Sequence, residues 1–306
     1  MNTKEHIPLV SVIIYVYNSR DHIIETLDSV KSQTYPKIEL IVTDDLSSDN
    51  TLDLVESWFK ENQDKFISTK IIRTSFNTGI AGNNNRGLAA ASGEWVKFLP
   101  GDDILFPDAV QSLVNGITND EIGFVYSNAK LFRNHLDNVI SVKGEYIEKP
   151  EKISLIKENK ILAMSTLINK TILINLGGFD EKYPMIDDWP LWLKLAENDV
   201  GFSYVNAITA GYRKHDKNIS KTGFSKRYLQ SWFSFCEDHL IPKGIKNGFY
   251  SISYSRYVNK NIFDIQKNIE NPYLLKASNI LNFLKFSFIK DFFRFKITTL
   301  TEEKAQ

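Results

Sequence analysis

The sequence is poor in the features that mark several specialised classes of protein. A single cysteine, Cys236, excludes an internal disulfide framework and a cysteine-rich metal site, and it is consistent with the reducing environment of the cytoplasm. The 15 glycines and 9 prolines among 306 residues exclude a fibrous repeat. No stretch approaches the roughly 20 apolar residues of a membrane-spanning helix, and the N-terminus has no apolar secretion signal. We therefore expect a protein that is cytoplasmic or peripheral to a membrane.

The chain also lacks an excess of charge of either sign. It contains 37 Lys and Arg residues and 37 Asp and Glu residues, so no overall field favours nucleic acid as a partner. Residues 241–306 differ, because they contain 11 basic and 5 acidic side chains, a net charge of +6. Residues 279–300 combine six phenylalanines with four basic residues. We predict that this segment contacts anionic lipid at the cytoplasmic face of the inner membrane; packing of an ordinary helix on the rest of the protein explains the pattern equally well.

The first 130 residues alternate between apolar runs of strand length and helical patterns. We expect strands over Leu9–Tyr15, Ile38–Thr43, Lys70–Arg73 and Trp95–Leu99, and helices over Asp21–Ser32, the segment after Asn50, Ala81–Ala91 and Pro107–Val114. Later we expect strands near Phe124–Asn128 and Ile161–Ile168, and a helix over Trp189–Ala196. This alternation predicts an α/β protein with a mostly parallel sheet, whose ligands bind beyond the carboxyl ends of the strands.

Two acidic pairs follow predicted strands directly. Asp102 and Asp103 repel each other unless a cation or basic group lies between them, and such oxygen ligands suit Mg²⁺ or Mn²⁺. A solvated turn or a helix cap explains this pair equally well. Asp44 and Asp45 could accept hydrogen bonds from a base or ribose, although capping of the next helix is the simpler reading of that pair alone.

Two further segments carry groups suited to catalysis. Asp187 and Asp188 precede a helix, either as capping residues or as a general base held between tryptophans. Arg213, Lys214 and His215 form a basic stretch that could neutralise a leaving diphosphate, with solvated surface charge as the alternative.

Four spaced blocks of the sequence together point to one family. They are VSVIIYVYN, SVKSQTYPKIELIVTDDLSSDNT, NTGIAGNNNRGLAAASGEWVKFLPGDD and GGFDEKYPMIDDWPLWLKL. Over about residues 8–220 the chain resembles glycosyltransferase family 2, of the bacterial surface-polysaccharide type. The resemblance implies a GT-A fold, which is Rossmann-like, a nucleotide-sugar donor, a divalent Mn²⁺ or Mg²⁺ ion, and inversion at the anomeric carbon by a single displacement. It further implies a catalytic domain over residues 1–222, with a nucleotide-binding half (1–128) and an acceptor-binding half (129–222), followed by a helical region over 223–306.

The resemblance also assigns roles to single residues by position. Asp188 falls on the catalytic base, with Asp187 beside it. The nucleotide site implied in this way consists of Tyr15, Tyr17, Asn18, Asp44, Asp45, Asn77, Gly79, Asn84 and Asp102. The metal site consists of Asp103, Asp102 and His215, and the diphosphate contacts are Arg213 and Lys214.

The chain departs from the family pattern at four positions. Pro100 replaces an aspartate, Asn84 replaces an arginine, and Tyr15 and Val16 replace the usual Pro-Thr, a change that narrows the nucleotide pocket. The Gln-x-x-Arg-Trp segment of processive synthases is absent from the sequence, which favours transfer of a single sugar.

The resemblance therefore implies transfer of one hexose or N-acetylhexosamine from a UDP-sugar to a polyprenyl-diphosphate-linked glycan of an O-antigen or capsule. Two alternatives stay open at this point. One is a dTDP-rhamnose or GDP-sugar donor, and the other is a catalytically silent partner that binds a nucleotide-sugar or glycan.

Overall fold

The computed structural model describes residues 6–133, 135–143, 152–216, 218, 225–249, 252, 253 and 256 of the chain. The chain divides into two compact units, Met1–Ser231 and Trp232–Gln306. The first unit includes residues 225–231, which form hydrogen bonds with its earlier segments. Arg227 donates to Asn77, and the Ser231 hydroxyl accepts from the Met185 N–H.

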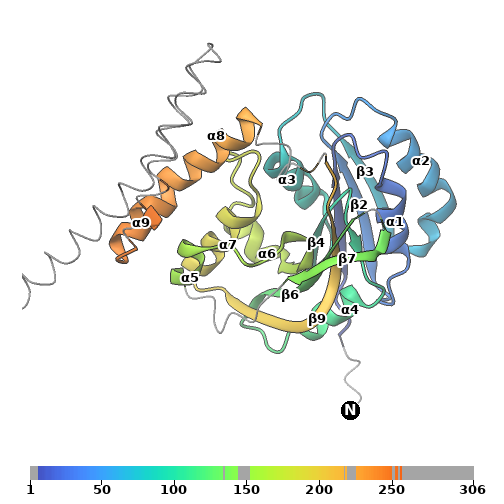
Figure 1. The fold of residues 1–306 in the computed structure, drawn as a ribbon. Coiled ribbons are helices and arrows are strands. Elements are labelled where there is room, and N and C mark those ends of the chain that lie inside the picture. Colours follow the sequence, from blue (N-terminus) through green and yellow to red (C-terminus); the bar gives the residue numbers. More distant parts are fainter. Residues whose placement is uncertain are drawn as a thin grey trace, which may run out of the picture. The chain divides into compact units, whose positions relative to one another are not determined.

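A mixed sheet forms the centre of the first unit (Figure 1). Among the described residues it has nine strands in the order β3-β2-β1-β4-β8-β6-β9-β5, with β7 paired to β6. The strands are β1 (Val10–Val16), β2 (Ile38–Asp44), β3 (Ser68–Arg73), β4 (Trp95–Pro100), β5 (Ile104–Leu105), β6 (Ile122–Arg133), β7 (His135–Lys143), β8 (Thr166–Asn169) and β9 (Gly201–Arg213). Strands β1 to β4 are mutually parallel and β6 runs parallel to β9, whereas β8 is antiparallel to both β4 and β6. The predicted mostly parallel α/β sheet is confirmed.

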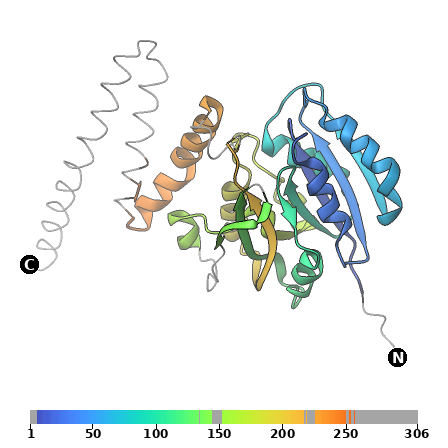
Figure 2. The ribbon, with the colours of Figure 1, turned by 45° about the vertical axis from the view of Figure 1, so that its right-hand side comes forward.

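Helices cover both faces of this sheet (Figure 2). The helices of the first unit are α1 (Ile23–Lys31), α2 (Thr51–Asn62), α3 (Ile80–Ala90), α4 (Ala109–Asn115), α5 (Lys152–Lys157), α6 (Lys170–Asn175) and α7 (Asp188–Glu197). The even-numbered residues of β1 join α1, α2 and α4 in one apolar core. The odd-numbered residues face α3. Gly87 allows this helix to approach closely, because a Cβ at that position would lie only 2.4 Å from the Ile13 side chain. On the same face, Trp192 of α7 packs on Phe124 of β6 with ring centroids 4.7 Å apart.

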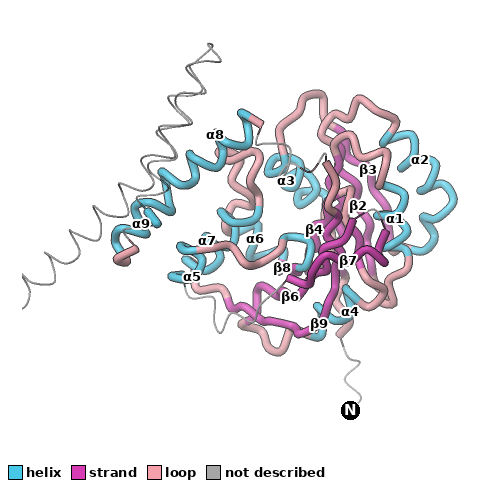
Figure 3. Tube along the Cα trace, viewed as in Figure 1, coloured by secondary structure: helices cyan, strands magenta, loops and turns pink. Residues whose placement is uncertain are grey.

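The predicted elements of the first 130 residues are present within a few residues of their expected ends. In the middle of the chain the differences are larger (Figure 3). Only the end of Ile161–Ile168 is a strand, because Ala163–Ser165 forms a 3-10 turn before β8. The long strand β9 was not predicted, since Asn206 interrupts the apolar alternation of its sequence GFSYVNAITAGYR and its partner β6 is distant in sequence.

The described part of the C-terminal region is helical, with α8 (Lys226–Phe235), a π-helical turn (Cys236–Leu240) and α9 (Ile241–Lys246). The phenylalanine-rich segment 279–300, for which we predicted membrane contact, lies outside the described residues. Within the described part of the chain, every helix is too short or too polar to cross a bilayer.

A buried carboxylate joins the amino ends of the parallel strands. Glu39 of β2 is fully buried and accepts hydrogen bonds from Ser11 of β1 and from Ser92, while Lys70 of β3 pairs with it at 2.8 Å. Burial alone would raise the pKa of this carboxyl, but the hydrogen bonds from Lys70, Ser11 and Ser92 outweigh it and lower the pKa to about 2. Glu39 is therefore charged in the folded protein and ties three strands and the α3–β4 loop together.

We expect Glu39→Gln to lower the free energy of unfolding by about 3 kcal/mol near neutral pH, because a folded-state pKa this far below the ordinary value represents that much stabilisation. The contribution is complete above pH 4.5 and is lost as the pH falls toward 2, so the difference from wild type should shrink over this range. Urea unfolding at several pH values measures it. Glu94→Gln, at an exposed pair with His6, serves as the control and should cost under about 1 kcal/mol; equal losses in both variants would contradict the prediction.

Candidate active site

A cavity of about 680 Å³ opens at the carboxyl ends of β1, β2 and β4. This is the place that the topology predicts, because loops after adjacent parallel strands meet there. Both acidic pairs contribute to its lining, Asp102 and Asp103 from the turn after β4, and Asp187 and Asp188 from the start of α7. The four segments that the sequence singled out therefore come together at one cavity.

Asp45 fixes the loop before α3 to the end of β2. Its Oδ1 accepts from the backbone N–H of Thr78 at 2.9 Å and from Arg86 at 2.7 Å, and its Oδ2 accepts from the Gly79 N–H at 2.7 Å. Gly79 is required here, because its φ is +90° and a Cβ would lie 2.5 Å from the Pro184 carbonyl oxygen. Asp44 accepts from the Ser47 N–H. Neither carboxylate caps α2, so the capping alternative for this pair is wrong.

Tyr17 and Asn18, which follow β1, line the cavity close to Asp45. The Tyr17 side chain is 54% exposed and lines the cavity, as expected for an aromatic ring available for stacking on a base. Asn18 has a φ of +53°, and its Oδ1 accepts from the Ser48 N–H at 2.8 Å. Asn77 also lines the cavity and donates to the Asp45 carbonyl oxygen. Together with Asp45, these three side chains form the part of the cavity that suits a flat, polar group.

The pair after β4 is not a solvated turn. Asp103 is fully buried; its Oδ1 accepts from the Arg213 backbone N–H at 2.9 Å, and its buried Oδ2 has no hydrogen-bond partner among the described residues. Burial, and then the charge of Asp102, hold the pKa of Asp103 well above its ordinary value. The Oδ2 of Asp102 lies 2.9 Å from Nε2 of His215. A bound cation would satisfy the orphaned oxygen and offset the repulsion.

The residues present therefore fit a divalent metal ion, with a limit on the donor set. In the described part of the chain, no group of three or more His, Cys, Asp or Glu side chains is arranged to hold a metal ion by itself. The unpartnered Oδ2 of Asp103 would supply one ligand, with Asp102 or His215 as a second, and oxygens of a bound diphosphate would have to complete the coordination.

Arg213 does not face the cavity, which corrects the prediction that it binds a diphosphate. The residue is 1% exposed; its Nε donates to the Asp102 carbonyl oxygen at 2.9 Å and its Nη2 donates to Glu25 at 2.6 Å. The guanidinium also lies over the ring of Phe132, 4.6 Å from its centroid. Arg213 thus supports the acidic turn from behind. Lys214 lies outside the cavity lining as well, with its Nζ 4.4 Å from the ring centroid of Tyr212.

Asn84 is also placed differently from its prediction. It is fully buried and donates to the Oδ2 of Asp187 at 2.9 Å, so it supports the acidic pair of α7 and does not line the nucleotide end of the cavity. Arg86, two residues later on α3, reaches Asp45 instead.

The acidic pair of α7 has the environment of a general base. Asp187 stands at the helix N-cap without a capping hydrogen bond, while Asp188 accepts from Asn159 at 2.7 Å and from the Trp189 N–H at 2.7 Å. Burial, and then the charge of Asp188, raise the pKa of Asp187 to about 7. Burial also raises the pKa of Asp188. One proton is therefore readily taken up by the pair near neutral pH.

Three residues of the site were missed by sequence reasoning. His22 lines the cavity with its ring centroid 5.0 Å from that of His215, Asn159 holds Asp188, and Arg227 of α8 lines the cavity beside Asn77. His22 and Asn159 stand in no motif. Arg227 is the first arginine after the basic segment 213–215. Because it lies in the region that we predicted to be a separate helical extension, we did not expect it to line the cavity.

We expect Arg213→Met to lower the free energy of unfolding by about 2 to 3 kcal/mol, because a buried Asp102 carbonyl and Glu25 lose a charged donor. Arg227→Met, at an exposed cation of the same cavity, should change stability by under about 1 kcal/mol. Urea unfolding of both variants compares them. Equal stability of the Arg213 variant and the wild type would mean that the guanidinium does not support the turn.

Comparison with known proteins identifies the family. The model of Glycosyl transferase family 2 matches residues 11–166. The UDP-Glc:alpha-D-GlcNAc-diphosphoundecaprenol beta-1,3-glucosyltransferase WfgD of Escherichia coli is 30% identical over 228 residues, which cover 73% of this chain and 84% of WfgD. The structure of S. aureus TarS 1–349 in complex with UDP-GlcNAc aligns with a TM-score of 0.61 and 20% identity over 74% of this chain and 65% of that one. The mannosyltransferase PcManGT from Pyrobaculum calidifontis, in complex with GDP-Man and Mn²⁺, aligns with a TM-score of 0.57 and 19% identity over 90% of this chain and 74% of that one. The fold is that of the GT-A transferases, and the chain belongs to glycosyltransferase family 2.

Proposed function

We propose that this protein is an inverting, metal-dependent transferase that moves one hexose or N-acetylhexosamine from a UDP-sugar to a glycan linked to polyprenyl diphosphate. The observation that carries this proposal is the meeting of two acidic pairs at one cavity, Asp102 with Asp103 and Asp187 with Asp188. They come from separate segments and have different partners. One pair has an orphaned oxygen suited to a cation, and the other has carboxyls suited to taking up a proton.

Asp188 would act as the general base. Its carboxylate takes the proton of an acceptor hydroxyl as that oxygen attacks the anomeric carbon, while the bond between this carbon and the diphosphate oxygen breaks and UDP leaves. Attack from the side opposite the leaving group inverts the configuration. The raised pKa of the Asp187–Asp188 pair assists this step, because the proton is accepted readily near neutral pH.

The leaving diphosphate would lie at Asp102, Asp103 and His215. These residues would hold a Mn²⁺ or Mg²⁺ ion, whose positive charge would stabilise the leaving diphosphate. The protein's own task is to hold the ligand oxygens in place, and Arg213 and Asn218 do so through Asp103 and Asp102. With Arg213 buried, Arg227 at the rim of the cavity becomes a candidate cation for the diphosphate in its place.

The donor and acceptor are proposed from the substrates of related enzymes. The name of WfgD specifies UDP-glucose as its donor and a diphosphoundecaprenol-linked GlcNAc as its acceptor. Family membership makes a substrate of this class the first choice for the present chain. A polyprenyl acceptor would require the enzyme to work at the cytoplasmic face of the membrane. PcManGT was solved with GDP-Man, so a GDP-sugar, or dTDP-rhamnose, is the alternative donor class. A silent binding partner is less well supported, because the base and both metal-site carboxylates are present.

We expect UDP to stabilise the protein against heat only when Mn²⁺ is present, because the diphosphate and Asp102–Asp103 share the ion. At about 100 times its dissociation constant, a ligand adds about 2.7 kcal/mol to the free energy of unfolding. Thermal unfolding with UDP, dTDP and GDP, each with and without Mn²⁺, measures the preference. In the Asp103→Asn variant, the part of the UDP stabilisation that depends on Mn²⁺ should be lost. A larger shift with GDP or dTDP would replace the UDP assignment, and no shift with any nucleotide would favour the silent partner.

We expect Asp188→Asn to reduce turnover by at least about 1,000-fold, because an amide cannot take up the proton of the acceptor hydroxyl. The dissociation constant for UDP should stay within a few-fold of wild type, since the nucleotide lies elsewhere in the cavity. Steady-state transfer from a UDP-sugar, together with calorimetric UDP binding, provides both values. Asp120→Asn, at an exposed aspartate outside the cavity, is the matched control. Near-normal turnover of the Asp188 variant would refute the base assignment.

A further inference from the structure

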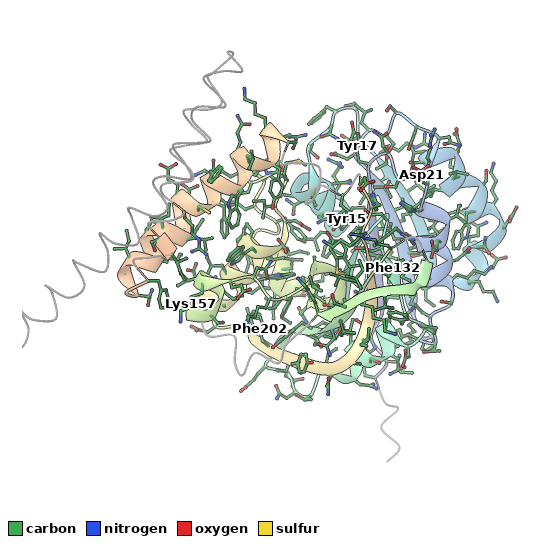
Figure 4. All side chains as sticks on the ribbon, in the orientation of Figure 1. Tyr15, Tyr17, Asp21, Phe132, Lys157 and Phe202 are labelled. Atoms are coloured by element: carbon green, nitrogen blue, oxygen red, sulfur yellow. The ribbon has the colours of Figure 1, made fainter. Side chains whose placement is uncertain are left out.

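Tyr15 lines the cavity at a position where the resemblance predicts a different residue. It occupies the position before the end of β1, between Thr43 of β2 and Pro100 of β4. Because side chains alternate along a strand, Tyr15 shares with Ile13 the face of the sheet covered by α3. Figure 4 labels it on the side of the sheet that carries α6 and α7, with Tyr17 farther along at the end of the strand.

Tyr15 has one acidic pair on each side of it in the fold: it pairs with Pro100, two residues before Asp102, and it shares the face of α3, whose Asn84 holds Asp187. The Tyr15 side chain lines the cavity and is partly exposed to it. Burial holds the pKa of its phenol well above the ordinary value, and the charges of all four aspartates of the cavity, Asp187 first and then Asp103, Asp102 and Asp188, raise it further. The phenol therefore keeps its proton at every pH at which the enzyme works, and it is a hydrogen-bond donor.

This donor is not used within the protein. Among the described residues, no side chain or backbone group forms a hydrogen bond with the Tyr15 hydroxyl. The tyrosines packed elsewhere behave differently: the hydroxyl of Tyr35 donates to the Pro8 carbonyl oxygen, and that of Tyr204 donates to Asn128. A phenol donor without a protein partner, on a residue that lines the cavity, is available for a ligand.

The position of this donor indicates which part of a ligand it reaches. If the diphosphate lies at Asp102 and Asp103 and the acceptor hydroxyl lies at Asp188, the transferred sugar must occupy the space between the two pairs. Tyr15 borders that space, so the sugar replaces the nucleotide that the resemblance assigned to this residue as its ligand. The nucleoside would lie at the other end of the cavity, where Tyr17 is exposed and Asn77 lines the wall.

We propose that Tyr15 determines the specificity for the donor sugar by donating a hydrogen bond from its hydroxyl to one hydroxyl of the sugar being transferred. The inference rests on the proposed function, because it requires the diphosphate and the base at the two acidic pairs. A donor sugar that lacks this hydroxyl, or carries it in the other orientation, loses the bond and leaves the phenol unpaired in the cavity.

The test is a double-mutant cycle between the protein and the sugar. The wild type and Tyr15→Phe are compared with UDP-glucose and with analogues that each lack one sugar hydroxyl. We expect Tyr15→Phe to lower kcat/KM for UDP-glucose by about 3- to 10-fold, the effect of one neutral hydrogen bond. With one analogue, the one lacking the partner hydroxyl, the two proteins should be equally active. If UDP-glucose is not a donor, the same series is made from the UDP-hexose that the wild type uses.

A control variant and a binding measurement separate the possible outcomes. Tyr204→Phe removes a phenol hydroxyl away from the cavity and should leave the ratios of kcat/KM among the donors unchanged. UDP should bind Tyr15→Phe within about two-fold of wild type. A uniform loss with all analogues, no loss with any, or a large loss of UDP binding would overturn the inference while leaving the proposed function intact. Failure of the wild type to bind UDP or to use any UDP-sugar would overturn both.

Discussion

The site depends first on the buried contact between Arg213 and the acidic turn after β4. At the end of β9, the Arg213 backbone N–H binds the carboxylate of Asp103, while its guanidinium binds the Asp102 carbonyl and Glu25 of α1. One residue thus joins three segments that are distant in the sequence. It also places His215, two residues later, against Asp102. The repulsion between the adjacent carboxylates is tolerated because a donor is built into the fold on one side and a ligand can bind on the other.

The second acidic pair is held in a complementary way. Asn84 and Asn159 are neutral donors, so they orient Asp187 and Asp188 without providing the positive charge that would lower their pKa values. Enclosure in the cavity wall then raises the pKa of both carboxyls. An arginine at position 84 would place a cation beside Asp187 and favour its charged form. With an asparagine there, the pair keeps its affinity for a proton.

Sequence reasoning was most successful where a side chain follows a parallel strand directly. Tyr17, Asp45 and Asp102 each come after a mainly apolar run of strand length, so their meeting at one edge of the sheet follows from the parallel topology. Sequence reasoning failed where a residue that contacts the site comes from a segment in which no motif or strand was predicted. Asn159 stands in a loop, and β9 pairs with a strand about 80 residues earlier, so their contacts with the site have no local signal.

The sequence by itself therefore determined the family, the parallel strands and the acidic residues at their ends, because apolar periodicity and spaced motifs are local properties of the chain. Only the tertiary structure decided which charged side chains face the cavity. Arg213 and Arg227 are equally basic in the sequence, yet the pairing of β9 with β6 turns Arg213 onto Phe132 and away from the cavity, whereas α8 brings Arg227 to its rim. The direction of a side chain is set by strand register and helix placement, and both depend on contacts between segments far apart in the chain.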